Sequence, residues 1–253
     1  MKIATWNVNG IRARAGQVAD WLAAERPDIA CLQEIKATVE QIPTLLLSLD
    51  DYWTCWHGAK GYSGVSLHVS KRIAPEAPPF RYPPFDVESR AVTAEIDGVT
   101  YASIYVPNGG RDLEAKLRFL DEMCDYAARF AARGAPLVVC GDLNVAREER
   151  DVHPKERKPR AVGQLPVERE KFAAILAAGL VDVGRALDPD NDNLFTWWAP
   201  WRSLRERNIG WRLDYVLASA SLARGATSSH VGREIGTSDH GPVVVELGDQ
   251  PSA

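Results

Sequence analysis

The stretch Leu137-Val138-Val139-Cys140-Gly141-Asp142-Leu143-Asn144 joins four apolar residues to a carboxylate and a carboxamide. An apolar run of this kind predicts a buried strand, and Gly141 permits a sharp turn after it. Polar side chains that directly follow a buried strand are commonly functional. Asp, Asn and Gly are also ordinary turn residues, so the stretch taken alone leaves a functional site and a simple turn both open.

Polar residues stand at the ends of other predicted strands as well. Lys2–Asn7 ends in an asparagine, and Asp28–Gln33 is followed directly by Glu34. A turn or a cap explains any single case, but the repetition favours one shared site, because strand ends can converge at one edge of a sheet. The polar residues at strand ends are Asn7, Glu34, Tyr105, Asn108, Asp142, Asn144, Asp214, Asp239 and His240.

Hydrophobic periodicity and turn residues divide the chain into short strands and helices. Asp97-Gly98 predicts a β-hairpin, whereas Arg147–Pro166 shows little periodicity and much charge, so we expect an exposed loop there. Hairpins joined to helices predict an α/β fold of two packed, mainly antiparallel sheets flanked by helices, forming one domain over residues 1–253. The predicted helices are Ala13–Arg26, Leu113–Arg133 and Val167–Ala178, and the predicted strands are Lys2–Asn7, Asp28–Gln33, Tyr52–Trp56, Gly64–Val69, Ala91–Ile96, Val99–Val106, Leu137–Cys140, Leu194–Trp198, Arg212–Ala218 and Val243–Leu247.

The composition is that of an ordinary globular protein and excludes several classes. Of the 253 residues 45% are hydrophobic and 25% are charged, and no apolar run approaches the roughly 18 residues of a membrane helix. Met1–Trp6 leads directly into a strand without a signal-peptide pattern, so we expect a cytoplasmic protein with no membrane partner. The cysteines show no C-x-x-C spacing, which argues against a zinc site or a disulfide framework. A net charge of −4 argues against a protein that coats nucleic acid over its whole surface.

If the strand ends converge, the site holds carboxylates, amides, one phenol and one imidazole, without a cysteine nucleophile. Hard oxygen donors of this kind suit Mg²⁺, with Mn²⁺ as a substitute, and suit zinc poorly. A divalent cation held by one or two carboxylates leaves room for a phosphate oxygen. The residues therefore predict a site for phosphoryl chemistry.

Six sequence blocks carry these residues: Trp6-Asn7-Val8-Asn9-Gly10, Leu32-Gln33-Glu34-Ile35-Lys36, Tyr105-Val106-Pro107-Asn108, Gly141-Asp142-Leu143-Asn144-Val145, Trp211-Arg212-Leu213-Asp214-Tyr215 and Ser238-Asp239-His240. Each block alone is a weak signal, but the ordered set is specific. In order and approximate spacing, the set resembles the exonuclease III family of apurinic/apyrimidinic endonucleases over about residues 2 to 247. That family belongs to the endonuclease/exonuclease/phosphatase superfamily, so the resemblance implies a four-layered α/β sandwich.

The resemblance also implies a role for each matching residue. A metal and an imidazole offset charge that develops on the phosphoryl oxygens, while a carboxylate activates the attacking water. The implied metal residues are Glu34 as the principal ligand, with Asn7 and Asp239 close to the ion. The implied catalytic residues are Asp142 as the group that orients or deprotonates water, Asn144 as its positioner, His240 paired with Asp214 against the phosphate, and Tyr105 and Asn108 as further phosphate contacts.

An aromatic segment, Phe195-Thr196-Trp197-Trp198-Ala199-Pro200-Trp201, precedes the fifth block. Most of it is typical of a core, and we expect Phe195 and Trp198 to be buried. By the resemblance, however, an apolar pocket admits a flipped-out abasic sugar and excludes an intact nucleotide by its shape. The residues implied in DNA recognition are Trp197, Trp211 and Leu213 in the pocket, Trp201 as a wedge in the duplex, Arg111 in a groove, and Arg202, Arg205 and Arg207 on backbone phosphates.

These inferences predict a Mg²⁺-dependent DNA repair phosphodiesterase, acting as a monomer. It incises double-stranded DNA 5′ to abasic sites and also trims or cleans blocked 3′ ends. Two alternatives stay open: mainly a 3′→5′ exonuclease with weak abasic-site activity, and a noncatalytic DNA-binding protein on this fold. Where many relatives carry Gly-Phe-Thr-Pro-Glu-Glu-Arg, this chain has Gly163-Gln164-Leu165-Pro166-Val167-Glu168-Arg169. This departure leaves open the balance between incision and exonuclease activity.

Overall fold

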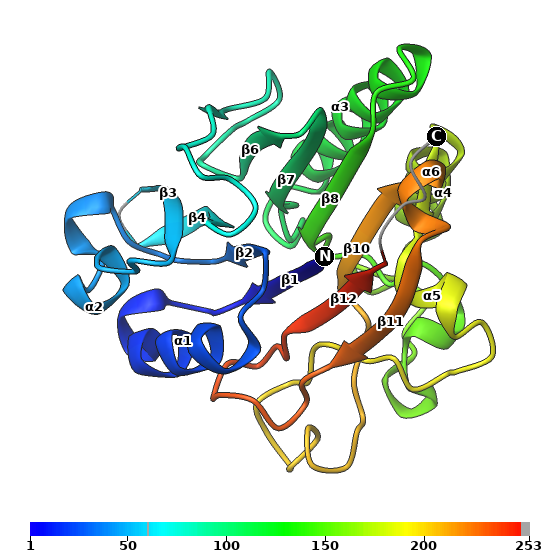
Figure 1. Ribbon diagram of the computed structural model, residues 1–253. Helices are drawn as coiled ribbons and strands as arrows, with labels where there is room; N and C mark the ends of the chain where they lie inside the picture. The colour runs from blue at the N-terminus through cyan, green and yellow to red at the C-terminus, as the bar shows by residue number, and fades with distance from the viewer. Residues whose placement is uncertain (60, 249–253) are drawn as a thin grey trace.

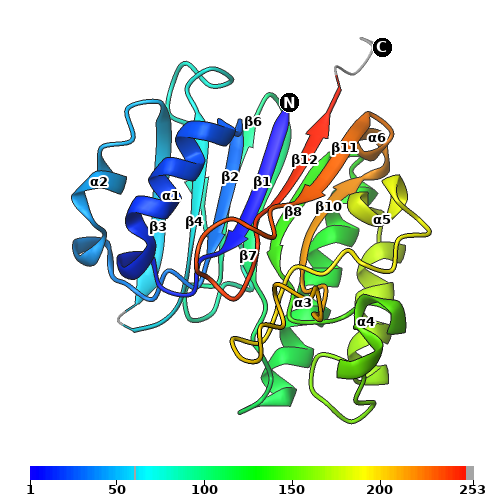
Figure 2. The same cartoon turned by 90° about the horizontal axis from the view of Figure 1, so that it is seen from below.

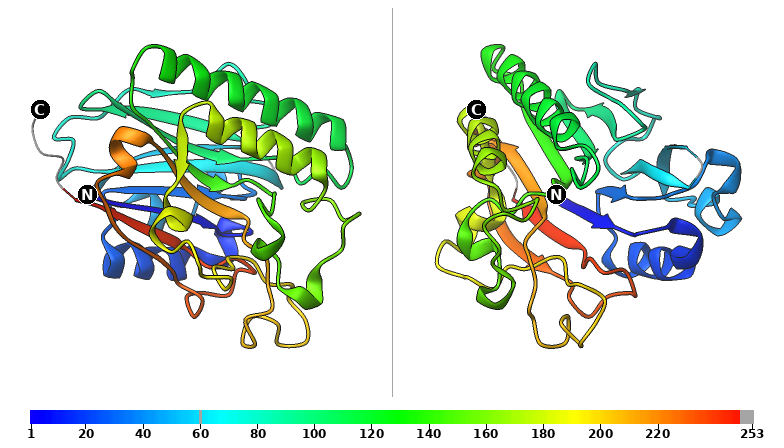
Figure 3. Two further views of the ribbon diagram at one scale, coloured as in Figure 1. Left: turned by 90° about the vertical axis from the view of Figure 1, so that its right-hand side faces the viewer. Right: turned by 180° about the vertical axis from the view of Figure 1, so that it is seen from behind.

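Two β-sheets pack face to face in the computed structural model, which describes residues 1–59 and 61–248. Helices α1 (Ile11–Glu25) and α2 (Thr44–Leu47) cover the outer face of one sheet, and α3 (Leu113–Ala132) and α4 (Pro166–Ala177) cover that of the other (Figure 1, Figure 2). Figure 3 shows α3 and α4 lying side by side on their sheet. The predicted four-layered α/β sandwich is confirmed.

Each sheet has six strands. The first contains, in spatial order, β11 (Ala226–Val231), β12 (Val243–Leu247), β1 (Lys2–Asn7), β2 (Ile29–Gln33), β4 (Tyr62–Ser70) and β3 (Tyr52–Ala59). The second contains, in spatial order, β5 (Phe80–Arg81), β6 (Ala91–Ile96), β7 (Val99–Tyr105), β8 (Leu137–Asp142), β10 (Asp214–Ser219) and β9 (Leu180–Asp182).

The two sheets repeat one local arrangement. In each, a single parallel pair, β1 with β2 or β7 with β8, is joined by a helical crossover and flanked by antiparallel strands. The carboxyl ends of a parallel pair therefore lie together at one sheet edge. At the same edge begin β12, which is antiparallel to β1, and β10, which is antiparallel to β8. This topology collects the polar strand ends that the sequence pattern singles out.

Three apolar clusters hold the layers together. Residues such as Cys31, Val65 and Val138 fill the space between the sheets. Further clusters bury Trp21 of α1 against the first sheet and Phe119 of α3 against the second. Full burial of one such large side chain contributes about 1.5–3 kcal/mol. The layers thus form a rigid support beneath the polar sheet edge.

Two local predictions are wrong. Leu194–Trp198 is not a strand: Trp197 forms only isolated bridges to Trp211 and His240, because this aromatic segment packs between two loops rather than into a sheet. Arg147–Pro166 is not simply exposed, since it contains buried Asp151 and two short 3-10 turns. The short elements without a clear periodic signal are β5, β9, β11, α2, α5 (Val183–Leu187), α6 (Ala220–Ala223) and the 3-10 turns Val39–Gln41, Glu149–Asp151 and Pro154–Glu156. No helix among the described residues has the length and apolar character needed to cross a membrane.

Candidate active site

Four polar side chains from the two parallel strand pairs meet where the sheets face each other. Asn7 ends β1, Glu34 follows β2, Tyr105 ends β7 and Asp142 ends β8. Asn7 Nδ2 donates to Glu34 Oε1 at 2.9 Å and to Asp142 Oδ2 at 2.9 Å, and thereby bridges the two sheets. The Tyr105 hydroxyl donates to Glu34 Oε1 at 2.9 Å. These hydrogen bonds fix the two carboxylates relative to each other.

A tight turn after β8 holds the Asp142 carboxylate. A Cβ atom on Gly141 would lie 1.8 Å from a carbonyl oxygen of β7, so only glycine fits here. Asn144 has a left-handed φ of 51°, and its backbone N–H donates to Asp142 Oδ1 at 2.8 Å. The Asn144 side chain donates to the Val106 carbonyl at 2.9 Å and accepts from Asn108 Nδ2 at 3.2 Å. The stretch is therefore a turn and a site together, because the turn orients the carboxylate.

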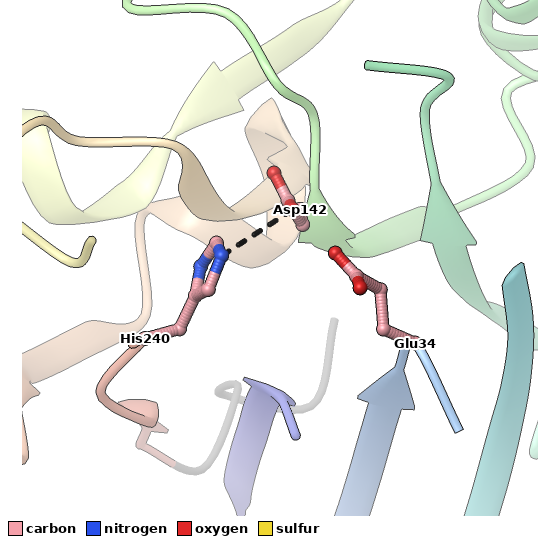
Figure 4. Close-up of side chains that lie close together, drawn as sticks. All are labelled: Glu34, Asp142 and His240. Carbon is pink, nitrogen blue, oxygen red and sulfur yellow. Dashed lines mark ion pairs between the residues drawn. The ribbon is translucent and has the colours of Figure 1, made fainter. Parts of the chain in front are cut away.

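His240 faces Asp142 across the site (Figure 4). Its Nδ1 lies 2.8 Å from Asp214 Oδ2, and its Nε2 lies 3.9 Å from Asp142 Oδ2. Asp214 begins β10 directly opposite Asp142, and its backbone N–H donates to the Thr196 hydroxyl at 3.0 Å. Burial alone would lower the pKa of His240, but the Asp214 carboxylate outweighs burial and raises this pKa to about 10. The imidazole therefore carries a positive charge at neutral pH.

The two central carboxylates differ in their affinity for a proton. Burial raises the pKa of Asp142 well above its usual range, and nearby carboxylates add to the rise while His240 opposes it. Burial also acts to raise the pKa of Glu34, but the hydrogen bonds from Asn7 and Lys36 outweigh burial and lower it. Lys36 Nζ lies 2.6 Å from Glu34 Oε2. Carboxylates whose pKa values are pushed apart are typical of catalytic sites.

One polar atom from each of Glu34, Asp142 and His240 lies within 4.8 Å of the other two (Figure 4). With His240 protonated, only the two carboxylates of this trio can act as ligands to a cation. Next to them, Asp214 Oδ1 is buried and has no hydrogen-bond partner in the described part of the chain. Oxygen donors that carry uncompensated negative charge are the chemistry that a hard divalent cation requires. The residues present therefore fit a divalent-cation site.

Asp239, which was predicted close to the metal, lies beside this trio rather than in it. Asn9 Nδ2 donates to its Oδ1 at 2.8 Å, and Trp197 Nε1 donates to its Oδ2 at 2.9 Å. Lys36 Nζ in turn donates to Asn9 Oδ1 at 2.7 Å, so a chain of hydrogen bonds links Glu34 to Asp239. Asn9 and Lys36 belong to the quoted sequence blocks, but only their neighbours in space reveal what they do.

Trp197 and Trp211 pack edge-to-face next to His240. Their ring centroids lie 5.5 Å apart with the planes at 78°, and the Trp197 ring centroid lies 6.5 Å from that of His240. Leu213 is buried, and its backbone N–H donates at 2.9 Å to Thr196, the residue that precedes Trp197. The three residues predicted to line a pocket thus lie together beside the reactive groups, and Phe195 and Trp198 are buried as expected.

Other side chains predicted to contact DNA surround this centre. Trp201 is 59% exposed, an unusual environment for a tryptophan. Arg111 is exposed and lines a cavity of about 830 Å³ together with Tyr105 and Asn108. Arg202 and Arg207 are exposed as well. These positions are accessible to a large ligand that approaches the sheet edge.

Arg205, which was also predicted to contact a backbone phosphate, makes hydrogen bonds inside the protein. Its Nε, Nη1 and Nη2 atoms donate to the carbonyl oxygens of Arg233, Ser238 and Ile235, respectively. The guanidinium stacks on the Trp198 ring, with its Cζ atom 5.3 Å from the ring centroid. Three of the five guanidinium N–H groups therefore donate inside the protein, and Arg205 supports the fold of this region.

A fully buried ion pair behind the site, Lys116 with Glu168, also escaped the sequence interpretation. Lys116 Nζ donates to the backbone carbonyls of Asn144 at 2.6 Å and Asn108 at 3.2 Å, as well as to the Glu168 carboxylate. The pair therefore ties together the loops after β7 and β8. One signal was present in the sequence, because Lys116 lies four residues before Leu120, on the apolar face of the predicted helix.

Comparison with known proteins gives a consistent result. The family model described as "Endonuclease/Exonuclease/phosphatase family" matches residues 4–240. DNA repair nuclease APEX1 of Danio rerio is 35% identical to this chain, covering 98% of it and 82% of that protein. The exodeoxyribonuclease of Bacillus subtilis is also 35% identical, covering 96% of this chain and 98% of that one. The solved structure of an AP endonuclease from Archaeoglobus fulgidus has a TM-score of 0.88 at 30% identity, covering 98% of this chain and 99% of the other.

Proposed function

The chain belongs to the endonuclease/exonuclease/phosphatase family and is a hydrolytic nuclease, and we propose that it incises double-stranded DNA 5′ to abasic sites with the help of a divalent cation. The observation that supports this most is the convergence of Glu34, Asp142 and His240 beside the side chains of Trp197 and Trp211. The first group suits hydrolysis of a phosphodiester, and an apolar pocket next to it suits a sugar that lacks its base. The relatives named as a DNA repair nuclease and an AP endonuclease support DNA as the substrate.

Glu34 would hold the divalent cation, with Asn7 and Asp239 close to it. We propose Mg²⁺ as the ion and Mn²⁺ as a substitute, since the donors are hard oxygen atoms. When bound, the cation offsets negative charge on the phosphate oxygens. Lys36 keeps Glu34 ionised and in place through its 2.6 Å contact.

Asp142 accepts the proton of the attacking water. The raised pKa that burial imposes on this carboxylate makes it a stronger base than an exposed aspartate, and Asn144 fixes its orientation. His240, protonated and held by Asp214, presents Nε2 toward the phosphate, where it stabilises developing negative charge. Tyr105 and Asn108 contribute further contacts to the phosphate.

Contacts to the rest of the duplex come from exposed side chains around the pocket. We propose that Trp201 wedges into the duplex, that Arg111 enters a groove, and that Arg202 and Arg207 meet phosphates, which gives sequence-independent affinity. All these residues and the reactive groups belong to one chain, so we expect a monomer. We also expect one catalytic domain over residues 1–253, of which residues 60 and 249–253 lie outside the described part.

A 3′→5′ exonuclease acting mainly on DNA ends is the second candidate, and the exodeoxyribonuclease relative favours it. The same reactive groups serve both reactions, so only the pocket discriminates between them. Changing Trp211 to Ala should lower incision at an abasic site more than nucleotide removal from a recessed 3′ end. Equal losses on the two substrates, measured in parallel on one preparation, would remove the argument from pocket shape. A noncatalytic DNA-binding role is set aside, because the relatives are nucleases.

The deciding experiment uses a duplex oligonucleotide with one tetrahydrofuran abasic analogue in a labelled strand. We expect a single product cut on the 5′ side of the analogue in Mg²⁺ or Mn²⁺, and no product after the metal is removed with EDTA. An identical duplex with a normal nucleotide at this position serves as the matched control. If the abasic strand stays intact in Mg²⁺ while a recessed 3′ end is degraded, the exonuclease alternative is correct.

A further inference from the structure

Asp239 and His240 lie at the end of a segment without regular structure, residues 232–240. Within this segment the carbonyl oxygens of Arg233, Ile235 and Ser238 need hydrogen-bond donors. No backbone amide of residues 1–59 and 61–248 donates to any of these three oxygens. Backbone hydrogen bonds hold the start of the segment, where the Gly232 and Ile235 amides donate to the Pro242 and Gly232 carbonyls, but the three carbonyls depend on side-chain donors from elsewhere.

Arg205 supplies the missing donors. One of its nitrogens donates to each of the three carbonyls, at 2.5 Å for Arg233 and 2.8 Å for Ile235, and its third contact is to Ser238, which directly precedes Asp239. The planar guanidinium has a fixed fork of donors, which suits three acceptors arranged around it. Stacking on the buried ring of Trp198 fixes the plane of the group.

Arg205 itself belongs to the loop that carries exposed Trp201. The Leu204 backbone N–H donates to the Trp201 carbonyl at 3.3 Å, so this loop turns back on itself just before Arg205. The same two regions meet again where the Trp198 backbone N–H donates to the Asp239 carbonyl at 2.9 Å. Trp197 Nε1 also donates to Asp239 Oδ2 at 2.9 Å. The loop proposed to contact DNA and the segment that presents His240 are therefore joined at several places, and the Arg205 side chain alone supplies three of the hydrogen bonds.

We propose that Arg205 is a positioning residue, which holds the segment of residues 232–240 against the Trp201 loop so that His240 reaches its place only when both are correctly seated. This inference rests on the proposed function, since it assigns Arg205 a part in the same reaction. A positioning role for Arg205 and a phosphate contact by Arg205 predict changes in different measured quantities. A phosphate contact supports DNA affinity, whereas a positioning residue supports the rate of the bound complex.

The test is chemical rescue. Arg205→Ala should lower the single-turnover rate at saturating DNA by about 10- to 100-fold, because a displacement of about 1 Å at reacting groups has an effect of this size. Addition of 20 mM guanidinium chloride should restore part of the lost rate, whereas 20 mM sodium chloride should not. Arg205 is only partly buried, so a free guanidinium ion can enter the space that the side chain leaves.

Arg233→Ala is the matched control, because its guanidinium points away to the exposed Glu234 and makes none of these contacts. We expect an unchanged rate for this variant, with or without guanidinium. Arg205→Lys, which offers one nitrogen instead of three, should lie between wild type and Arg205→Ala in rate, and serves if the alanine variant does not fold. A wild-type rate in the lysine variant, or a loss of DNA affinity with an unchanged single-turnover rate, would overturn the proposal.

Failure of this proposal and failure of the proposed function are separable. If wild-type protein does not cut the abasic duplex, the proposed function fails, and the variants are then compared on a recessed 3′ end. If wild-type protein cuts and Arg205→Ala cuts equally fast, only the role of Arg205 fails.

Discussion

Two clusters of buried charge in this molecule use the same kinds of side chain in opposite ways. We call the first the reactive cluster; it comprises Glu34, Asp142, Asp214, Asp239 and His240. The second, the paired network, comprises Arg147, Asp151, Asp182, Arg185 and Arg212. The clusters are neighbours, since only one residue separates Arg212 from Asp214 in the chain.

In the paired network each carboxylate meets a guanidinium. Arg212 makes two contacts with Asp182, at 2.8 and 2.5 Å, and Arg185 lies 2.8 Å from Asp151. Burial acts to raise the pKa of Asp182, but Arg212 outweighs burial and lowers it. The network holds the backbone of Arg212 as well, because its N–H donates to the Asp151 carbonyl at 2.8 Å. Its charges are compensated, and its contribution is to structure.

Among the described residues, the four carboxylates of the reactive cluster form ion pairs with only two cations, His240 and Lys36. A buried charge without a partner destabilises the folded state, so such an arrangement persists where function requires it. A buried acid therefore indicates function when the charge of its carboxylate lacks a compensating partner. An uncompensated acid stays available to a cation and to a proton, and a compensated one does not.

Asp142→Asn, in the reactive cluster, should have the largest effect. We expect the single-turnover rate on abasic DNA to fall by about 10³-fold, because the amide cannot accept a proton from water. DNA affinity should persist, since the shape of the site is kept. Without divalent cations, the variant should be at least as stable as wild type to urea, because one uncompensated charge is gone.

Asp190→Asn is the control for this change, since Asp190 is exposed and belongs to neither cluster. It should leave both the rate and the urea midpoint unchanged. A near-normal rate in Asp142→Asn would show that another group activates the water. A clear loss of stability would show that Asp142 is compensated after all.

The opposite result is expected for Asp182→Asn in the paired network. The change removes the charge that two contacts of the buried Arg212 and one contact of the half-buried Arg147 compensate, and the free energy of unfolding should fall by about 3 kcal/mol. Urea denaturation of this variant beside Asp142→Asn measures the contrast directly. Equal stabilities of the two variants would contradict the distinction between the clusters.

The reactive cluster could be predicted from the sequence to a large extent. Asn7, Glu34 and Asp142 follow apolar runs, and strands that end in polar residues converge when they lie parallel in one sheet. His240 and Asp214 stand at the beginning of antiparallel strands, so the same topology brings them to the same edge. An apolar run and a change to polar character at its end carry this information within a few positions of the chain.

The supporting contacts could not be predicted in the same way. Arg205 and Arg212 both occur in a basic, polar stretch, yet one binds three backbone carbonyls and the other a buried aspartate. The partner of a long cationic side chain is set by loops that meet only in the folded state. The prediction of a strand over Leu194–Trp198 was wrong for a related reason. Its aromatic residues pack between loops and do not pair with a strand of either sheet.

A divalent cation that binds at the reactive cluster should raise the free energy of unfolding by about 1 kcal/mol, and the paired network should not contribute to this effect. At a Mg²⁺ concentration ten times its dissociation constant, binding stabilises the folded state by about 1.4 kcal/mol. Wild-type protein should therefore unfold at higher urea in MgCl₂ than in NaCl of equal ionic strength, and EDTA should reverse the difference. Glu34→Gln should lose this stabilisation, while Glu206→Gln, at an exposed position, should keep it. Retention of the full effect by Glu34→Gln would place the cation elsewhere.

Buried titratable groups in this protein are not only compensated or uncompensated charges, because His68 in β4 is buried and neutral. The ring packs edge-on against Tyr52 and Trp56, its Nε2 lies 2.9 Å from Ser66 Oγ, and burial lowers its pKa to about 3. The pKa of a histidine in the unfolded chain is about 6.5. The pKa of His68 is therefore lower in the folded state than in the unfolded state. The contribution of neutral His68 to stability should therefore be fully present above about pH 6.5 and should be lost as the pH falls toward 3.

Between pH 7 and 5.5 this linkage removes about 1 kcal/mol of stability from wild-type protein, whereas His68→Gln has no proton to take up. The pH dependence of the urea midpoint should thus be shallower in His68→Gln than in wild type. His230→Gln, which replaces an exposed histidine, should keep the wild-type slope. Parallel slopes for wild type and His68→Gln would mean that His68 accepts a proton in the folded state. In that case burial without a charged partner would not by itself keep a side chain neutral in this protein. The excess negative charge of the reactive cluster would then no longer indicate a functional site.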